Sequence, residues 1–185
     1  HEATGPETGG RTGGKIGGFI CAVGTGGTLA GTSRYLKEKH PGIVNACADP
    51  NGFAMYELFK HGKAKSTPGD SITEGIGLGR VTPVVETAKV DDAFLVSDEE
   101  AVNVIYELVE HEGLCLGGSS GINIAGAIRL AKQLGPGKTI VTILCDAGNR
   151  YQSKLFNPAF MRSKNLPVPT WLEKRSKIDM PFEKA

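Results

Sequence analysis

The 185-residue sequence lacks the residue patterns that mark metal-binding and nucleic-acid-binding proteins. Its four histidines have no metal-ligand spacing, and none of its four cysteines forms a C-x-x-C pair. Aromatic residues are few, with seven Phe, four Tyr and one Trp, so platforms for stacking bases are not expected. Lysine and arginine total 21 against 20 acidic residues, and no basic run is interleaved with aromatics. We therefore expect no metal site and no nucleic-acid partner.

Long apolar runs and a signal peptide are also missing, so we expect no membrane association. The four cysteines, Cys21, Cys47, Cys115 and Cys145, each lie in an apolar run. This placement predicts buried, reduced thiols in a cytosol-like compartment rather than disulfides. The sequence starts at His1 rather than Met, so we expect that upstream sequence belongs to the natural protein.

The composition allows one hydrophobic core, because 39% of the residues are hydrophobic. We expect one domain over residues 1–163. Prolines and mixed charges predict a tail over residues 164–185, with Trp171 and Leu172 docking on the body of the domain.

The feature around which the chain is organised is the turn Gly24-Thr25-Gly26-Gly27-Thr28. It follows the apolar run 19–23 and precedes a helical pattern, so it joins a strand to a helix start. Each hydrogen bond from a backbone N–H group to a charged phosphate oxygen contributes about 1.5–3 kcal/mol, against about 0.3–1 kcal/mol for the helix dipole. The pattern favours a phosphate site built from N–H groups. The alternative is an ordinary turn with Thr28 as the helix N-cap.

Spacing alone leaves the phosphate ligand open. The dinucleotide fingerprint G-x-G-x-x-G is matched by Gly24 and Gly26, but its third glycine is replaced by Leu29. Asp49 ends the next apolar run, where a ribose-binding acid is expected. A P-loop is excluded because no Gly-Lys-Ser/Thr follows the turn.

A second glycine-rich turn, Gly117-Gly118-Ser119-Ser120-Gly121, also opens a helix. Between the two turns lies a long polar segment, residues 62–81, that ends in repeated glycines. A loop of this length in a compact domain is functional or disordered, so we weigh a ligand-facing segment against a floppy surface loop.

The expected elements alternate between strand and helix. We expect strands over residues 17–23, 43–48, 93–96, 114–116 and 139–144, and helices over 28–39, 53–61, 98–112 and 117–134. Ser97 and Glu100 have the spacing of a capping box. This order predicts an α/β fold with an open, mostly parallel sheet and helices on both faces. Ligands of such sheets bind beyond the carboxyl ends of the strands, where both glycine-rich turns lie.

Three motifs carry a family resemblance: Gly24-Thr25-Gly26-Gly27-Thr28-Leu29-Ala30-Gly31, Glu74-Gly75-Ile76-Gly77, and the run from Glu112 to Gly121. Together they resemble the cysteine synthases (O-acetylserine sulfhydrylases), which belong to the tryptophan-synthase-β-like, fold-type-II family of pyridoxal-phosphate enzymes. The resemblance covers residues 1 to about 172. Cystathionine β-synthases share most of these motifs.

The resemblance implies pyridoxal 5′-phosphate as cofactor, with Gly24, Thr25, Gly26, Gly27 and Thr28 at its phosphate and Ser119 at its pyridine nitrogen. A neutral hydroxyl there leaves the ring nitrogen unprotonated, which suits β-replacement. The alternative for Ser119 is a helix N-cap, a role that Ser120 is equally able to take. The segment through Gly75 is implied to face the substrate.

The implied reaction replaces acetate in O-acetyl-L-serine by sulfide to give L-cysteine. A homodimer, serine acetyltransferase as a partner, and a cytoplasmic location follow from the same resemblance, with the mitochondrial or plastid matrix left open. A cystathionine β-synthase-like enzyme and a non-catalytic nucleotide- or phosphate-binding module are the alternatives.

The sequence departs from the family pattern at several places. Thr8-Gly9-Gly10 replaces an apolar pair, and Ala147 and Asn149 replace commoner residues beside Gly148. The family's Schiff-base lysine in a Pro-Ser-x-x-Lys-like context and its Thr-Ser-Gly-Asn-Thr loop are both missing, and Lys154 lacks that context. We therefore expect the C-terminal part of a longer enzyme, with no catalytic residue in this chain and no activity of the chain alone.

Overall fold

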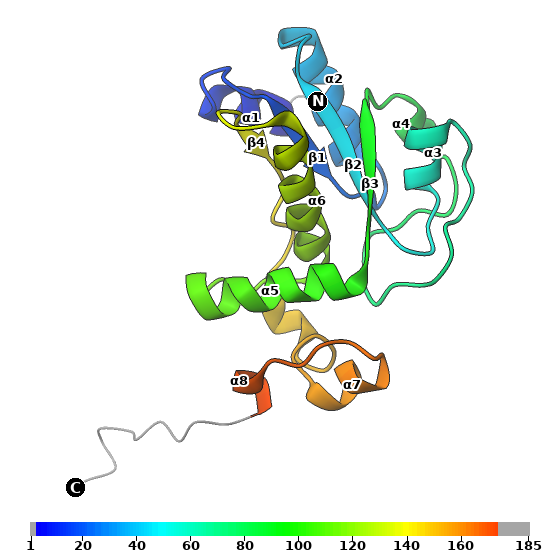
Figure 1. Ribbon diagram of the computed structural model, residues 1–185. Helices are drawn as coiled ribbons and strands as arrows, with labels where there is room; N and C mark the ends of the chain where they lie inside the picture. The colour runs from blue at the N-terminus through cyan, green and yellow to red at the C-terminus, as the bar shows by residue number, and fades with distance from the viewer. Residues whose placement is uncertain (1–2, 174–185) are drawn as a thin grey trace, which may run out of the picture.

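The computed structural model describes residues 3–173, and a four-stranded parallel sheet lies at its centre (Figure 1). The strands are β1 (Gly18–Cys21), β2 (Val44–Pro50), β3 (Asp92–Val96) and β4 (Ile140–Val141). Their order is β3-β2-β1-β4, and every neighbouring pair is parallel. The predicted α/β class is confirmed.

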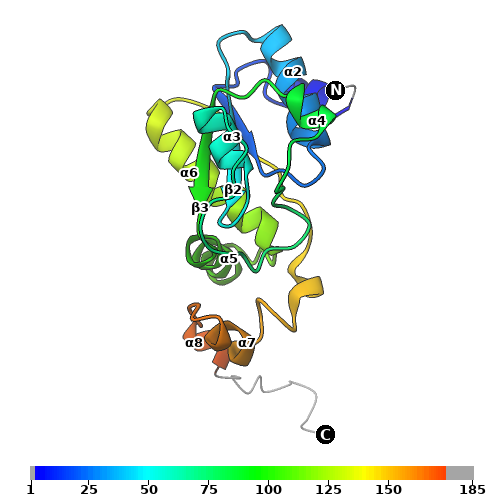
Figure 2. The ribbon, with the colours of Figure 1, turned by 90° about the vertical axis from the view of Figure 1, so that its right-hand side faces the viewer.

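Helices cover both faces of this sheet (Figure 2). The helix α6 packs against β1, β2 and β3 on one face, whereas α2 and α3 contact the strands from the other face and α1 packs against α2. The described helices are α1 (Thr4–Arg11), α2 (Gly27–Lys39), α3 (Met55–His61), α4 (Pro83–Glu86), α5 (Asp98–Glu112), α6 (Gly118–Leu134), the 3-10 helix η1 (Gly148–Tyr151), α7 (Pro158–Ser163) and α8 (Thr170–Glu173). None of these is long and apolar enough to cross a bilayer.

The side chains of β1 alternate between two hydrophobic clusters, as a strand buried on both faces requires. Phe19 packs with residues of α2, and Ile20 packs with residues of α6. A glycine on α6 allows a close approach, because a Cβ added at Gly126 would lie 2.8 Å from the Cβ of Ala48. The sheet and α6 therefore form one rigid unit at whose carboxyl edge both glycine-rich turns are held.

Two expected strands are shorter than the sequence predicted. Only Ile140 and Val141 of the expected strand 139–144 pair with β1, and Leu144 is 51% exposed. The hydroxyl of Thr142 donates to the carbonyl oxygen of Ile20 at 2.7 Å, so a side chain makes the next contact to β1. The expected strand 114–116 is reduced to a single antiparallel bridge between Leu116 and Ala147.

The start of α5 confirms half of the predicted capping box. The Ser97 hydroxyl accepts a hydrogen bond from the Glu100 N–H at 3.2 Å. The Glu100 carboxylate instead accepts a hydrogen bond from Arg129 Nε at 3.0 Å, which links α5 to α6. Gly113 ends α5 with a φ of 67°, as expected of a C-cap glycine.

The glycine-rich first helix forms despite its weak propensity because it packs against α2. A Cβ added at Gly5 would lie 2.7 Å from the Cβ of Tyr35, and one at Gly9 would lie 3.5 Å from its ring. Gly5 therefore leaves room for the Tyr35 side chain, whereas the substituted positions Gly9 and Gly10 have space for a larger side chain.

The expected docking of Trp171 and Leu172 is confirmed. The Trp171 ring meets the Tyr106 ring edge-on, with centroids 5.7 Å apart. Both residues pack on a hydrophobic cluster that includes Val102 of α5 and Met161 of α7. The rest of the expected tail, residues 174–185, lies outside the described residues.

The prediction of four buried thiols is right for two cysteines and wrong for the other two. Cys21 and Cys47 are buried in strands, whereas Cys115 and Cys145 are exposed. All four are free thiols. Cys115 and Cys145 lie in irregular segments beside α6, because the apolar runs around them do not form full strands.

Candidate functional site

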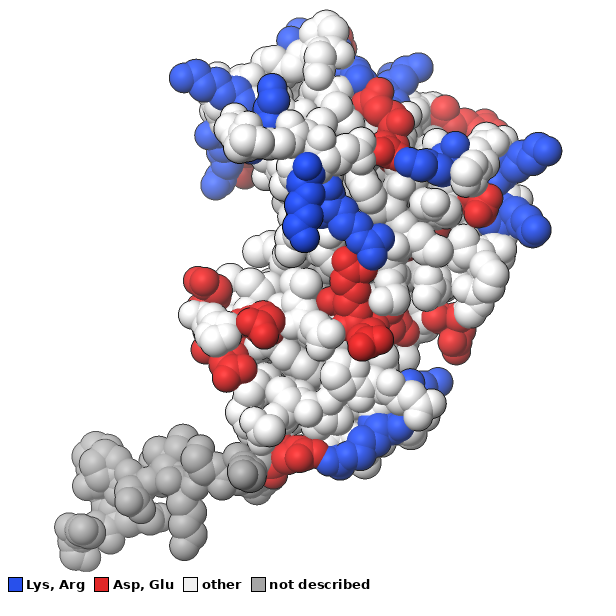
Figure 3. Space-filling view, viewed as in Figure 1, with Lys and Arg blue, Asp and Glu red and all other residues white. Residues whose placement is uncertain are grey.

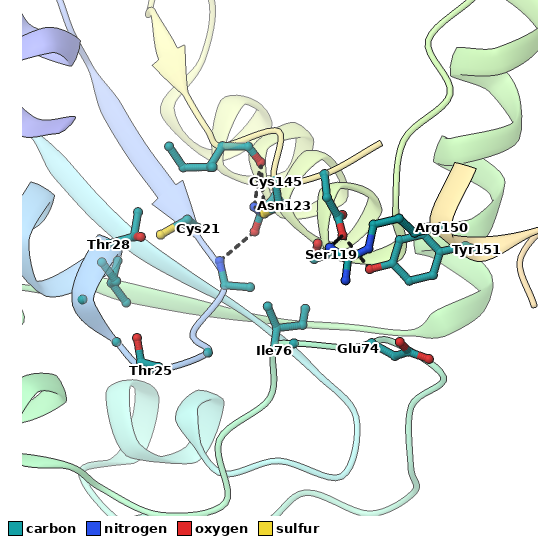
Figure 4. Close-up of a pocket in the computed structure, with 18 residues that line it drawn as sticks. Cys21, Thr25, Thr28, Glu74, Ile76, Ser119, Asn123, Cys145, Arg150 and Tyr151 are labelled. Atoms are coloured by element: carbon teal, nitrogen blue, oxygen red, sulfur yellow. Dashed lines mark hydrogen bonds and ion pairs between the residues drawn. The ribbon is translucent and has the colours of Figure 1, made fainter. Parts of the chain in front are cut away.

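A cavity of about 530 Å³ opens beyond the carboxyl end of β1 (Figure 4). It lies between the first turn of α2, the segment 74–76 and the first turns of α6. It is lined by all the residues that the family resemblance assigned to cofactor or substrate, namely Gly24, Thr25, Gly26, Gly27, Thr28, Gly75 and Ser119. The structure thus brings three distant segments of the chain to one place.

The first turn of α2 presents backbone donors to this cavity. The helix begins at Gly27 after Gly26, whose φ of 92° is favourable only for glycine. The first intrahelical bond runs from Ala30 N–H to Gly26 C=O at 2.9 Å, so the N–H groups of Gly27, Thr28 and Leu29 come before it. These N–H groups suit an anion. The alternative role of Thr28 as N-cap is wrong, because Thr28 lies inside the helix.

The glycine-rich end of the loop 62–81 lies directly against the turn 24–28 at the start of α2. A Cβ added at Gly24 would lie 2.4 Å from the carbonyl oxygen of Gly75, and Gly77 N–H donates to Val23 C=O at 2.9 Å. Earlier in the loop, Ile72 N–H donates to the Asp98 carboxylate at 2.7 Å. The floppy-loop alternative is therefore wrong for residues 72–77, which these bonds to Asp98 and Val23 hold in place.

Ser119 lies in the first turn of α6, is 4% exposed, and faces the cavity (Figure 4). The N-cap of α6 is Gly117 and has no side-chain cap bond, so the N-cap alternative is wrong for Ser119. Ser120 does not cap either, because its hydroxyl accepts a hydrogen bond from Cys145 N–H at 3.0 Å. Among the described residues the Ser119 hydroxyl has no hydrogen-bond partner, which leaves it free for a ligand.

Asn123 is a cavity residue that the sequence analysis missed. Its Oδ1 accepts from Ala22 N–H at 2.7 Å and its Nδ2 donates to Ile143 C=O at 2.8 Å. It is 1% exposed and holds the end of β1, α6 and the segment after β4 together. Its position one helical turn after Ser119 was the available signal, since residues four apart share a helix face.

Polar side chains from the segment after β4 form another part of the wall. The Tyr151 hydroxyl donates to Asp146 Oδ2 at 2.7 Å. Burial, and to a smaller extent the Asp146 carboxylate, raises the pKa of Tyr151 to about 12. At the mouth of the cavity, Glu74 pairs with Lys154.

A family model for "Pyridoxal-phosphate dependent enzyme" matches residues 1–146. The chain belongs to this family. Cysteine synthase 2 of Schizosaccharomyces pombe is 44% identical, over 92% of this chain and 47% of the relative, and cysteine synthase 1 of Neurospora crassa is 45% identical, over 94% and 48%. The solved O-acetylserine dependent cystathionine β-synthase of Helicobacter pylori has a TM-score of 0.73 and 35% identity, over 83% of this chain and 47% of that one. The chain spans about half the length of these relatives.

The cavity fits the pyridoxal phosphate on which this family depends. The N–H groups at the start of α2 suit its phosphate dianion. The free hydroxyl of Ser119 suits a ring nitrogen, and Ile76 and Ile143 add apolar surface for a flat ring. No lysine is among the cavity-lining residues of the described chain.

The alternative of a nicotinamide-type site is wrong, because the acidic residue on which it depends does not lie at the cavity. Asp49 is completely buried, and its Oδ2 accepts a hydrogen bond from Tyr56 N–H at 2.9 Å. It does not line the cavity. Burial raises the pKa of the Asp49 carboxyl to about 6, against the opposing effect of the N–H groups of Tyr56 and Met55.

This buried carboxyl predicts a specific dependence of stability on pH. Its pKa of about 6 lies above the ordinary value of 3.8, so between these values the folded protein keeps a proton that the unfolded chain releases. The stabilisation is complete below pH 3.8 and is lost as the pH rises through 6. Urea unfolding of the full-length enzyme at several pH values measures how the unfolding free energy falls between these pKa values, by at most about 1.4 kcal/mol per pH unit. The Asp49→Asn variant should lose this dependence on pH. The exposed Asp70→Asn variant is the control and keeps it; parallel curves for Asp49→Asn and wild type would contradict the assignment.

Proposed function

We propose that the full-length enzyme is a cysteine synthase, which replaces the acetate of O-acetyl-L-serine by sulfide to give L-cysteine. The observation that carries the proposal is the single cavity formed by the α2 turn, Gly75 and the free hydroxyl of Ser119. The relatives named cysteine synthase at 44% and 45% identity support it.

Each part of the cavity has a role in this proposal. The N–H groups of Gly27, Thr28 and Leu29, with the hydroxyls of Thr25 and Thr28, hold the cofactor phosphate. Ser119 donates its hydroxyl proton to the ring nitrogen and fixes the plane of the ring. The Gly75 backbone faces the substrate, where any side chain would narrow the space. When bound, pyridoxal phosphate supplies the electron sink that lets a leaving group depart from the β-carbon of the substrate.

Partners and location extend the proposal. We propose a homodimer, serine acetyltransferase as a binding partner, and a cytoplasmic location with an organelle matrix as the alternative; a 37% identical relative is named "Putative mitochondrial cysteine synthase" of Saccharomyces cerevisiae. Residues 1–163 form the domain that binds the cofactor and 164–185 its tail. Figure 3 shows lysine and arginine side chains over α6 and acidic side chains over α5. Ile128 of α6 nevertheless presents apolar surface, with 44% of it exposed. We propose that the rest of the enzyme or a second subunit covers such surface, and that the 185-residue chain alone is inactive.

A second candidate is cystathionine formation. The Helicobacter pylori structure and a 34% identical relative from Bacillus subtilis are both named O-acetylserine dependent cystathionine β-synthase. The two candidates differ in the nucleophile, sulfide or homocysteine. Full-length enzyme is given O-acetylserine with each nucleophile, and we expect cysteine formation to be faster. Faster cystathionine formation would select the second candidate, and absence of the visible absorbance of bound cofactor would favour a non-catalytic module.

Substitution of Ser119 tests its proposed role at the ring nitrogen. We expect Ser119→Asp to keep the cofactor but to protonate this nitrogen, which changes the absorbance of the bound cofactor and slows β-replacement by about tenfold or more, equivalent to about 1.4 kcal/mol. Ser119→Ala, which only removes a donor, should be milder. If both variants have the wild-type spectrum and activity per folded molecule, Ser119 has no role at the ring.

A further inference from the structure

The four thiols differ in their capacity to react. Cys21 and Cys47 are buried, and burial raises the pKa of both thiols well above the ordinary value. Because the thiolate is the nucleophile, these two are inert in the folded protein. Cys115 and Cys145 are exposed, and Cys145 alone of these two lines the cavity.

The surroundings of Cys145 hold its thiol in the cavity wall. Asn123 Nδ2 donates to its sulfur at 3.4 Å. The backbone is fixed because Cys145 N–H donates to the Ser120 hydroxyl at 3.0 Å. Asp146, the nearest carboxylate in sequence, is engaged by the hydroxyl of Tyr151.

A second observation shows that this wall faces a ligand. Ser119 is 4% exposed, lines the same cavity, and has no hydrogen-bond partner among the described residues. Figure 4 shows Ser119 and Cys145 on the same side of the cavity, across from Thr25 and Ile76. A flat ring held at the Ser119 hydroxyl would lie in the cavity that Cys145 also lines, and a group attached to the Cys145 sulfur would take up space in that same cavity.

We propose that Cys145 is a modification site for low-molecular-weight disulfides, and that modification and cofactor binding exclude one another. The thiolate of Cys145 attacks one sulfur of the disulfide, a new S–S bond forms, and the other sulfur leaves as a thiolate with the electron pair of the broken bond. A reducing thiol reverses the step by the same exchange. This inference rests on the proposed position of the cofactor, although the labelling itself needs no turnover.

The test uses full-length enzyme with and without its cofactor and 2-hydroxyethyl disulfide, a small uncharged probe. Peptide mass mapping follows the rate of modification at Cys145 and, as the matched control outside the cavity, at Cys115. At a cofactor concentration about 100 times its Kd, the free fraction of the site falls about 100-fold, and so should the rate at Cys145. The rate at Cys115 should not change. Enzyme modified at Cys145 should also fail to regain the absorbance of bound cofactor until a thiol is added.

Two variants separate the possible outcomes. Cys145→Ser should remove the cofactor-protected label, whereas Cys115→Ser should keep it. An unmodified Cys145 in the cofactor-free enzyme, or equal rates with and without cofactor, would overturn the proposal. Failure to form cysteine from O-acetylserine and sulfide would instead count against the proposed function, since protection of Cys145 depends on binding alone.

Discussion

The Asn123→Ala variant should lose about 3–4 kcal/mol of unfolding free energy, because it leaves two partly buried backbone groups without partners. Asn123 receives the N–H of Ala22 at 2.7 Å and donates to the carbonyl oxygen of Ile143 at 2.8 Å. Each buried group left unsatisfied costs about 1–3 kcal/mol, and the removed side chain leaves a small cavity besides. Urea unfolding of the full-length enzyme measures the loss.

Asn103 provides the matched control for this substitution. It lies on α5 and is exposed, so Asn103→Ala should change the unfolding free energy by no more than about 0.5 kcal/mol. The Asn123→Ala variant should also bind pyridoxal phosphate more weakly, because the walls that carry Cys21 and Cys145 are no longer held together. Equal stability of the two variants would show that water replaces the Asn123 amide without cost.

The Gly24→Ala variant should bind pyridoxal phosphate at least about tenfold more weakly and lose about 1–3 kcal/mol of stability. The added methyl group would lie 2.4 Å from the carbonyl oxygen of Gly75, which is backbone and has no rotamer by which to move away. Either the α2 turn or the segment through Gly75 must shift, and both line the cavity. Cofactor titration followed by absorbance, together with urea unfolding, measures both effects.

Gly27 is the control for the size of the added group. A Cβ there meets only the Thr25 hydroxyl at 3.8 Å, an ordinary contact, so Gly27→Ala should keep the stability of the wild type. It also lies inside the first turn of α2, where alanine is favoured over glycine. If Gly24→Ala and Gly27→Ala are equally stable, the close approach of Gly24 and Gly75 does not constrain the enzyme.

Local sequence patterns predicted where the helices begin, because helix starts depend on a few neighbouring residues. Glycine-rich turns after apolar runs predicted helix starts at 28 and 117, each within one residue of the observed starts at 27 and 118, and Ser97 located the start of α5. The same patterns misjudged 139–144, because an apolar run does not reveal how many strands lie beside it. Pairing ends at Phe19 and Val141 although β1 continues to Cys21, because the Thr142 side chain takes the carbonyl oxygen of Ile20 in place of the next backbone bond.

The sequence by itself determined the fold class and the two glycine-rich turns of the candidate site, because both rest on short motifs in a fixed order. Only the tertiary structure decided which of these residues meet, since the α2 turn, Gly75 and Ser119 are far apart along the chain and converge at one sheet edge. It also decided which polar side chains are already engaged. Ser120 and Asp49 are bonded to backbone N–H groups, and Ser119 is left free. Burial and hydrogen bonding depend on contacts between distant segments, and no local pattern encodes them.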